Sequence, residues 1–300
     1  SGFVIFLTIQ RTQTLTDFAV SRFARLYPVF WASAGVTLLF QLWNPVDIGT
    51  TEPLFVLMNL TMLAGFVTKA FIDPAYWSLG FELMFYFIIA ILFRARLLQP
   101  SRFVPVMATG LIGATLFAAV CSLVGWAFPI MPRQLTVPYT QLFIAGMVFF
   151  KLHQGERDWR LYALLAGCLA AHWTMLFNPG DHINLVSCLV VTASFGTFGL
   201  FLAGRLKFLA VKPLLTLGAW SYSLYLVHQV VGFSVMERLY TSGLVEHTVV
   251  AIAAALAVSL LLSWQLTIHI EQPAARAIKR WYRSRKAARS ISGLNRQIQP

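Results

Sequence analysis

The sequence predicts an all-α protein, a polytopic bundle of transmembrane helices, and three observations lead to this fold class. Hydrophobic residues make up 58% of the chain and charged residues 11%, whereas soluble domains average about a quarter charged residues. Apolar runs long enough to cross a bilayer recur along the chain. Between them, loops rich in Lys and Arg alternate with loops poor in both. This composition excludes an ordinary soluble domain.

The apolar runs predict about eight full spans and one partial span. The full spans lie near residues 26–44, 77–94, 103–124, 137–151, 161–177, 185–204, 214–236 and 247–269. The run at 1–9 is too short to cross, and because the chain starts without Met we expect that an upstream part is missing. The short run at 54–66 is interpreted as an interfacial or re-entrant segment. We expect one bundle over residues 1–275 and a basic tail over residues 276–300.

The net charge of +12 lies mainly in short loops and in the tail. Basic loops face the cytoplasm under the positive-inside rule, and an even number of spans returns the tail to that side. The charge therefore indicates membrane topology, with the lipid bilayer as partner, rather than nucleic-acid binding. We interpret the tail as an anchor to anionic lipid.

Other reactive side chains fit packing roles. Cys121, Cys168 and Cys188 lie inside apolar runs without metal-ligand spacing, so we expect three reduced, packed thiols. His172 lies in an apolar span and is expected to be packed and hydrogen bonded. No two histidines have the spacing of a zinc site. The sequence thus predicts no metal and no bound cofactor.

Glu82 opens a hydrophobic run that should enter the membrane. A carboxylate in hydrocarbon is costly and usually faces a bundle interior, where it marks a substrate or ion path. Ser78, Glu82 and Tyr86 are spaced i, i+4, i+8 and therefore lie on one helical face. The alternative is a Glu near the interface that pairs with a neighbouring Arg for structural reasons.

Arg22 and Arg25 are spaced i, i+3 on one face, where a basic loop enters a span. Two guanidiniums at such an entrance can hold phosphates or a carboxylate with permanent charge. The alternative is that both residues only satisfy the positive-inside rule.

A polar stripe crosses the span at 214–236. Ser221, Tyr225 and His228 follow i, i+4, i+7 spacing, so they share one helical face and should find partners within the bundle. They act either as interhelical hydrogen-bonding groups or, in the case of His228, as a proton relay or base.

The inner end of the last predicted span carries a third polar group, at residues 268–273. Pro273 should end or bend the helix, because it lacks an N–H and clashes with the preceding turn. Glu271 is expected to pair with a neighbouring Arg as a structural clamp.

Taken together, these segments resemble the acyltransferase 3 family of integral-membrane acyltransferases, which includes bacterial glycan O-acetylases. The resemblance rests on segments 1–3, 22–28 with Trp31, 77–86, 217–228 and 271–273, in the family's order. Each segment is short, but the ordered set spans nearly the whole chain. Residues 121–206 contribute only hydropathy.

The resemblance implies a bundle of about ten helices that moves an acyl group, commonly acetyl, from cytoplasmic acyl-CoA to an acceptor hydroxyl, often on a glycan at the outer side. It implies the bacterial inner membrane, with the basic tail in the cytoplasm. It also implies a key His on a first helix that this sequence lacks, and that role is not transferred to His228.

The matched segments supply the candidate site residues. The candidate catalytic residues are Glu82 and His228. The candidate substrate-binding residues are Arg22, Arg25, Tyr27, Trp77, Ser78, Tyr86, Ser221, Tyr222 and Tyr225. We expect the CoA phosphates near the two arginines and the other groups along a buried path. Two other functions remain open, a transporter or flippase that moves an acylated or glycan substrate without CoA, and a catalytically inactive scaffold.

Overall fold

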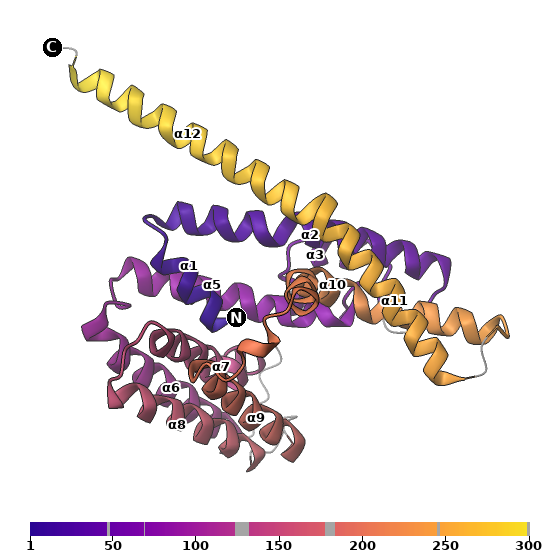
Figure 1. The fold of residues 1–300 in the computed structure, drawn as a ribbon, viewed down its shortest axis with the longest axis horizontal. Coiled ribbons are helices and arrows are strands. Elements are labelled where there is room, and N and C mark those ends of the chain that lie inside the picture. The colour runs from indigo at the N-terminus through magenta and orange to yellow at the C-terminus, as the bar shows by residue number, and fades with distance from the viewer. Residues whose placement is uncertain (47–48, 69, 124–131, 178–183, 245–246, 299–300) are drawn as a thin grey trace. The chain divides into compact units, whose positions relative to one another are not determined.

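The computed structural model describes the chain except residues 47–48, 69, 124–131, 178–183, 245–246 and 299–300. The described residues form helices joined by loops, with no strand among them (Figure 1), which confirms the all-α class. The chain folds into two compact units. The first contains residues 1–13 and 78–211, and the second contains residues 14–77 and 212–300.

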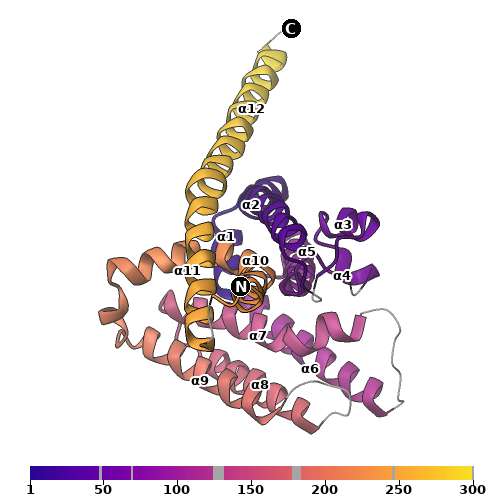
Figure 2. The ribbon, with the colours of Figure 1, turned by 90° about the vertical axis from the view of Figure 1, so that its right-hand side faces the viewer.

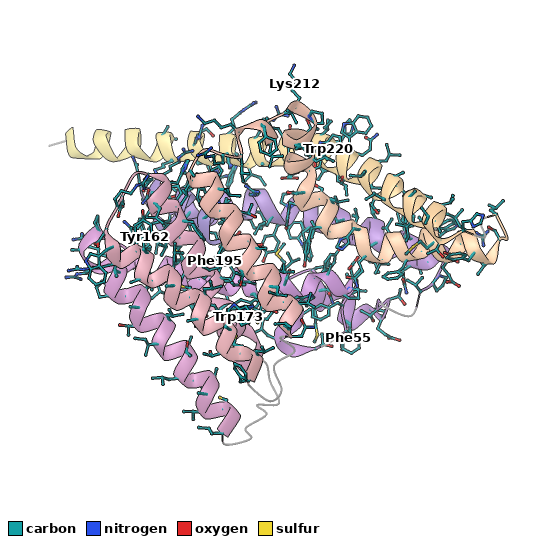
Figure 3. All side chains as sticks on the ribbon, turned by 60° about the horizontal axis from the view of Figure 1, so that its bottom comes forward. Phe55, Tyr162, Trp173, Phe195, Lys212 and Trp220 are labelled. Carbon is teal, nitrogen blue, oxygen red and sulfur yellow. The ribbon has the colours of Figure 1, made fainter. Side chains whose placement is uncertain are left out.

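The first unit is a set of packed helices. Its elements are α1 (Gly2–Gln10), α5 (Trp77–Arg94, from its second residue), α6 (Pro100–Leu123), α7 (Pro132–His153), α8 (Trp159–Thr174), η2 (Met175–Phe177), α9 (Leu185–Leu202) and η3 (Lys207–Leu209). Helices α6 to α9 lie alongside one another (Figure 2). Trp173 of α8, labelled in Figure 3, donates to Thr192 Oγ1 of α9 at 3.1 Å. His172, 3% exposed, bonds to Gln141 at 3.2 Å, so its predicted packing is confirmed.

Helices α1 and α7 approach each other backbone to backbone. A Cβ atom added to Gly146 would lie 2.8 Å from the backbone nitrogen of Phe3 and 3.0 Å from Cα of Gly2. Small residues permit such close helix contacts. Phe150 of α7 then meets the rings of Phe3 and Phe6 edge to face, with centroids 5.1 and 5.8 Å apart. The short α1 is thus held by α7.

Replacing Gly146 with Val is expected to displace α1, because the added side chain would collide with backbone atoms that cannot rotate away. Overpacking of this kind lowers the free energy of unfolding by about 1–3 kcal/mol. Gly110 of α6 provides the control, since an added Cβ there meets nothing within 4 Å. Thermal unfolding of both Val variants in detergent measures the difference, and equal melting temperatures would contradict the close approach.

The second unit is organised around α10. Its elements are α2 (Leu15–Trp43), α3 (Pro53–Asn59), α4 (Ala64–Val67), η1 (Pro74–Tyr76), α10 (Lys212–Thr241), α11 (Thr248–Leu266), the π-helical turn η4 (Thr267–Glu271) and α12 (Gln272–Ile298). Helix α10 packs against α2 and α11, and α12 packs against α2. Lys212, at the first turn of α10, points away from the ribbon (Figure 3).

The segment at 54–66 is not one continuous span. It forms the separate short helices α3 and α4, with Met62 in the left-handed region at a φ of 62° between them. Two helices of seven and four residues are too short to cross a bilayer. The interfacial position of this segment stays a prediction.

Pro273 was expected to end or bend the last helix. It does not end the helix, because α12 continues to Ile298. The preceding turn η4 is π-helical, and the N–H of Gln272 bonds to the carbonyl of Thr267, five residues back. This wider turn removes the need for an N–H at Pro273 and relieves the clash that a proline makes in an α-helix.

Six helices among the described residues are long and apolar enough to cross a membrane, by length and composition. They are Leu15–Trp43, Pro74–Arg94, Pro100–Cys121, Trp159–Phe177, Leu185–Leu202 and Thr248–Ala288. Helices α7 and α10, which the apolar runs predict as spans, are not among them. The protein is therefore a membrane protein with several spanning helices, and the number of crossings stays a prediction. Cys121, Cys168 and Cys188 are free and buried, as expected.

Candidate functional site

The predicted polar stripe lies on the continuous helix α10, but its members have different partners. The hydroxyl of Tyr225 donates to the backbone oxygen of Ala75 in η1. Ser221 is exposed, and its hydroxyl donates to the Gly218 carbonyl at 2.8 Å on the same helix. His228 is also exposed, and its Nδ1 lies 2.8 Å from the carbonyl oxygen of Tyr225. Of the three, Tyr225 thus makes the interelement bond that was predicted.

The hydrogen bond of His228 determines which ring nitrogen carries a proton. A carbonyl oxygen only accepts hydrogen bonds, so Nδ1 must carry a proton. In the neutral imidazole, Nε2 then holds the lone pair and is the basic nitrogen. The side chain is therefore arranged to accept a proton at Nε2 while Nδ1 stays bound to the helix.

The turn that begins at Asp73 clamps α10 two residues on either side of His228. The Asp73 carboxylate accepts the N–H of Val230 at 3.0 Å, and the Tyr76 hydroxyl donates to the carbonyl of Leu226 at 3.1 Å. Residues 226 and 230 are the acceptor and donor of one α-helical turn. The turn thus bonds to both ends of the helical step that contains His228.

Asp73 is fully buried and precedes the spanning segment Pro74–Arg94. Burial raises the pKa of this carboxyl above its ordinary value, and the N–H groups of Val230 and Ala75 and the charge of His228 oppose that rise. Because both oxygens accept from N–H groups, at 2.9 Å from Ala75 and 3.0 Å from Val230, the arrangement suits the carboxylate form.

A second bond network joins α10 to the turn η4. The buried Ser223 hydroxyl donates to Glu271 Oε2 at 3.0 Å and accepts from the Thr267 hydroxyl at 2.9 Å. Glu271 also interacts electrostatically with Arg25 of α2. Glu271 thus acts as the structural clamp predicted from the sequence, with a serine as its hydrogen-bonding partner. Tyr222 donates to the Leu26 carbonyl of α2 at 3.4 Å.

The predicted arginine face lies at the beginning of α2. Arg22 is 8% exposed, and Arg25 is exposed. Tyr27 has a structural contact, since its hydroxyl donates to the carbonyl of Thr61 at 3.1 Å in the turn between α3 and α4. Trp77, another candidate binding residue, is 41% exposed at the start of α5.

Glu82 forms its own polar cluster in the first unit. Its Oε1 accepts the Tyr86 hydroxyl at 2.6 Å and the Ser1 hydroxyl at 3.2 Å. Glu82 and Ser78 are half-buried and Tyr86 is buried. Glu82 and Tyr86, which were predicted to share one helical face, are thus bonded to each other. Glu82 belongs to the first unit and His228 to the second.

Sequence reasoning missed the role of Asp73. Asp73 precedes a proline, a pairing typical of a turn, and its side chain caps the turn η1 by accepting the N–H of Ala75. Its bond to Val230 joins residues 157 positions apart, and a single sequence carries no signal for such a contact. Ser223 was missed for the same reason, because its partner Glu271 lies 48 positions away.

Comparison with protein families identifies a match. The model of a family described as an acyltransferase domain, Acyl_transf_3, matches residues 1–268. No curated protein matches the chain, and no solved structure matches it.

Proposed function

Because the chain belongs to the acyltransferase 3 family, we propose that this membrane acyltransferase moves an acyl group, acetyl in the simplest case, from acyl-CoA to a hydroxyl group of a glycan or similar acceptor. The spanning helices make it an integral membrane protein. Its basic loops and tail support the bacterial inner membrane with the tail in the cytoplasm.

The proposed reaction is a direct transfer between a thioester and an alcohol. The acceptor oxygen forms a bond to the acyl carbon, the bond between that carbon and the CoA sulfur breaks, and the sulfur leaves. The proton of the acceptor hydroxyl passes to a base and then to the departing sulfur, so CoA is released as a thiol. Positioned proton transfer of this kind contributes about 10²- to 10⁴-fold to a rate.

The observation that supports a base in this chain is the ring of His228. Its Nδ1 is committed to the Tyr225 carbonyl at 2.8 Å, which leaves Nε2 as the proton acceptor. Asp73 places a buried negative charge within electrostatic reach of this ring, and such a charge stabilises the imidazolium that forms on proton transfer. We propose that His228 accepts the proton of the acceptor hydroxyl as a proton relay, a role separate from that of the key His that the resemblance places on another helix.

The test is replacement of His228 with Asn. The Asn amide N–H₂ takes the place of Nδ1–H and keeps the bond to the Tyr225 carbonyl, but an amide is not a base at neutral pH. We expect acyl transfer from acetyl-CoA, measured as free CoA thiol, to fall by about 100-fold or more with unchanged melting temperature.

Thr241→Ala is the matched control. It also removes a side chain of α10 that bonds to its own helix, since the Thr241 hydroxyl donates to the Glu237 carbonyl at 2.9 Å, and it should retain transfer. Full turnover in the His228→Asn variant would show that the ring has only a structural role. Movement of a labelled acceptor across the membrane without CoA would favour a transporter instead.

A further inference from the structure

Helix α2 carries a row of polar side chains on its buried face. Ser33, Thr37 and Gln41 are spaced i, i+4, i+8 and therefore share one side of the helix. Ser33 and Thr37 are fully buried, and Gln41 is 6% exposed. Because α2 is long and apolar enough to cross a membrane, buried polar groups at these positions should bond to neighbouring helices.

Two hydrogen bonds tie α2 to α10 near the two ends of this row. Tyr222 of α10 donates to the Leu26 carbonyl at 3.4 Å, and the Asn44 amide donates to the Ser234 carbonyl at 2.9 Å. The two helices therefore run in the same direction. The row lies between Leu26 and Asn44 in the sequence and shares their helical face, so it is turned toward α10.

Two further hydroxyl groups lie beside the row. Ser234 of α10 is fully buried. Tyr76 of η1 is 4% exposed, donates to the Leu226 carbonyl of α10 at 3.1 Å and also interacts with Thr37. We call the side chains of Ser33, Thr37, Gln41, Ser234 and Tyr76 the polar seam between α2 and α10.

Three atoms of the polar seam have no hydrogen-bonding partner among the described residues. They are Ser33 Oγ, Gln41 Oε1 and Ser234 Oγ. The amide nitrogen of Gln41 donates to the Val46 carbonyl at 2.6 Å, so the atom left over is an acceptor oxygen. Thr37 Oγ1 stands near the Tyr76 hydroxyl without hydrogen-bonding geometry. Buried polar groups without a partner are costly and therefore need an explanation.

Two other buried hydroxyls of this unit find partners within the protein. Ser263 of α11 is fully buried and donates to the Leu260 carbonyl of its own helix at 3.0 Å. Thr267 donates to Ser223 Oγ at 2.9 Å. Bonds of the first kind are an ordinary solution for serine and threonine in helices. The polar seam does not use it, which points to a partner that is not part of the chain.

We propose that the polar seam binds a single file of ordered water molecules that bridge α2 and α10. Buried waters in proteins bond to polar groups that the chain leaves unsatisfied. Successive positions of the row are about 6 Å apart along α2, and a water that makes two hydrogen bonds of about 2.8 Å spans about 5.6 Å. The bonds at Leu26 and Asn44 hold the helices together at both ends, which suits a ligand of this size.

The water file reaches the turn that holds His228 in place. Tyr76 belongs to the polar seam and also bonds to Leu226, while Asp73 of the same turn bonds to Val230. Water in the seam therefore hydrates the element that contacts α10 on either side of His228. The seam holds water whether or not the chain transfers acyl groups.

Oxidation by hydroxyl radicals tests the water file in the unmodified protein. Intense X-rays produce these radicals from water, so a buried ring is oxidised only where water lies beside it. We expect mass spectrometry of the full chain in nanodiscs to find Tyr76 and Phe30 oxidised several-fold faster than Phe6, although all three are 4% exposed or less. Phe30 lies against Tyr76, with ring centroids 5.1 Å apart.

Phe6 is the matched control for this measurement. It is a buried ring of the first unit, packed against the rings of Phe103 and Phe150 with centroids 5.2 and 5.8 Å away. If Tyr76 and Phe30 are oxidised no faster than Phe6, the polar seam is dry and the proposal is wrong.

Replacement of Ser33 with Ala has opposite effects in a hydrated and in a dry seam. If the hydroxyl binds water, its removal takes a partner from that water, and we expect the melting temperature to fall by about 2 °C or more. If the hydroxyl has no partner, Ala removes an unsatisfied buried group, and the melting temperature stays or rises. Ser263→Ala is the matched control and should shift the melting temperature by less than about 1 °C.

The two measurements together separate water from other partners. A lower melting temperature without oxidation of Phe30 would mean that Ser33 bonds to the protein itself, which would overturn the water file. A Ser33→Ala variant that melts like the Ser263→Ala control would overturn it as well. If Ser33→Ala does not fold, Ser234→Ala gives the same comparison. Neither assay measures acyl transfer, so their failure is distinct from failure of the proposed function.

Discussion

Replacing Glu82 with Gln is expected to abolish acyl transfer while leaving the folded yield unchanged. The carboxylate accepts the Tyr86 hydroxyl at 2.6 Å, and the Gln side-chain oxygen can accept the same bond. The substitution therefore keeps the local packing of α5 and removes only the negative charge and the capacity to accept a proton. We expect a loss of about 100-fold or more in free CoA released from acetyl-CoA, assayed with a cell-envelope glycan fraction as acceptor.

Glu237→Gln is the control for this experiment, because it makes the same chemical change at an exposed position near the end of α10. It should retain transfer. Size-exclusion profiles and melting temperatures of both variants establish that each is folded. Normal turnover in the Glu82→Gln variant would remove Glu82 from the mechanism and leave it as a structural partner of Tyr86.

Replacing Asp73 with Ala is expected to give the largest loss of stability in the second unit. Both carboxylate oxygens accept buried N–H groups, from Ala75 and from Val230, and these donors would lose their partner. Each buried donor left unsatisfied costs about 1–3 kcal/mol. Since the Val230 N–H can return to the carbonyl one helical turn back, we expect a net loss of about 2–4 kcal/mol in the free energy of unfolding.

Asp158→Ala is the control that separates the two hydrogen bonds of Asp73, its cap of the turn η1 and its long-range bond to Val230. Asp158 caps α8 through the N–H of Arg160 at 2.9 Å, at an exposed position, as Asp73 caps η1. Loss of an exposed cap lowers the free energy of unfolding by about 1 kcal/mol. The additional loss in the Asp73→Ala variant therefore measures the contribution of the bond to Val230. Hydrogen exchange should also become faster at Val230 in the Asp73→Ala variant. Equal losses in the two variants, with unchanged exchange, would contradict the clamp.

The bonds from Asp73 and Tyr76 to α10 also link the stability of the second unit to the position of His228, the candidate base. His228 lies between Leu226 and Val230, the two residues that bond to the turn at Asp73 and Tyr76. A substitution that removes these bonds should therefore make the His228 ring more mobile, as well as this turn of α10. Transfer by the Asp73→Ala variant is expected to fall even at temperatures where it is fully folded.

Short-range patterns in the sequence determined much of this structure. Hydropathy gave the all-α membrane class, because the bilayer excludes unpaired backbone and so requires helices of a known length. The 3.6-residue period put Glu82 and Tyr86 on one helical face, where the structure shows them bonded, and it put Ser221, Tyr225 and His228 on one face of α10. The ordered short motifs indicated the family, which the match over residues 1–268 shows.

Contacts between distant segments were decided by the tertiary structure alone. The bond of Asp73 to Val230, that of Ser223 to Glu271 and that of Asp17 to Lys286 join positions 157, 48 and 269 apart. No local period specifies such pairs, because each depends on which helix faces pack together. The same packing places Tyr282 and Lys286 of the basic tail against Asp17 of α2, while the anchoring of the tail to anionic lipid stays a prediction.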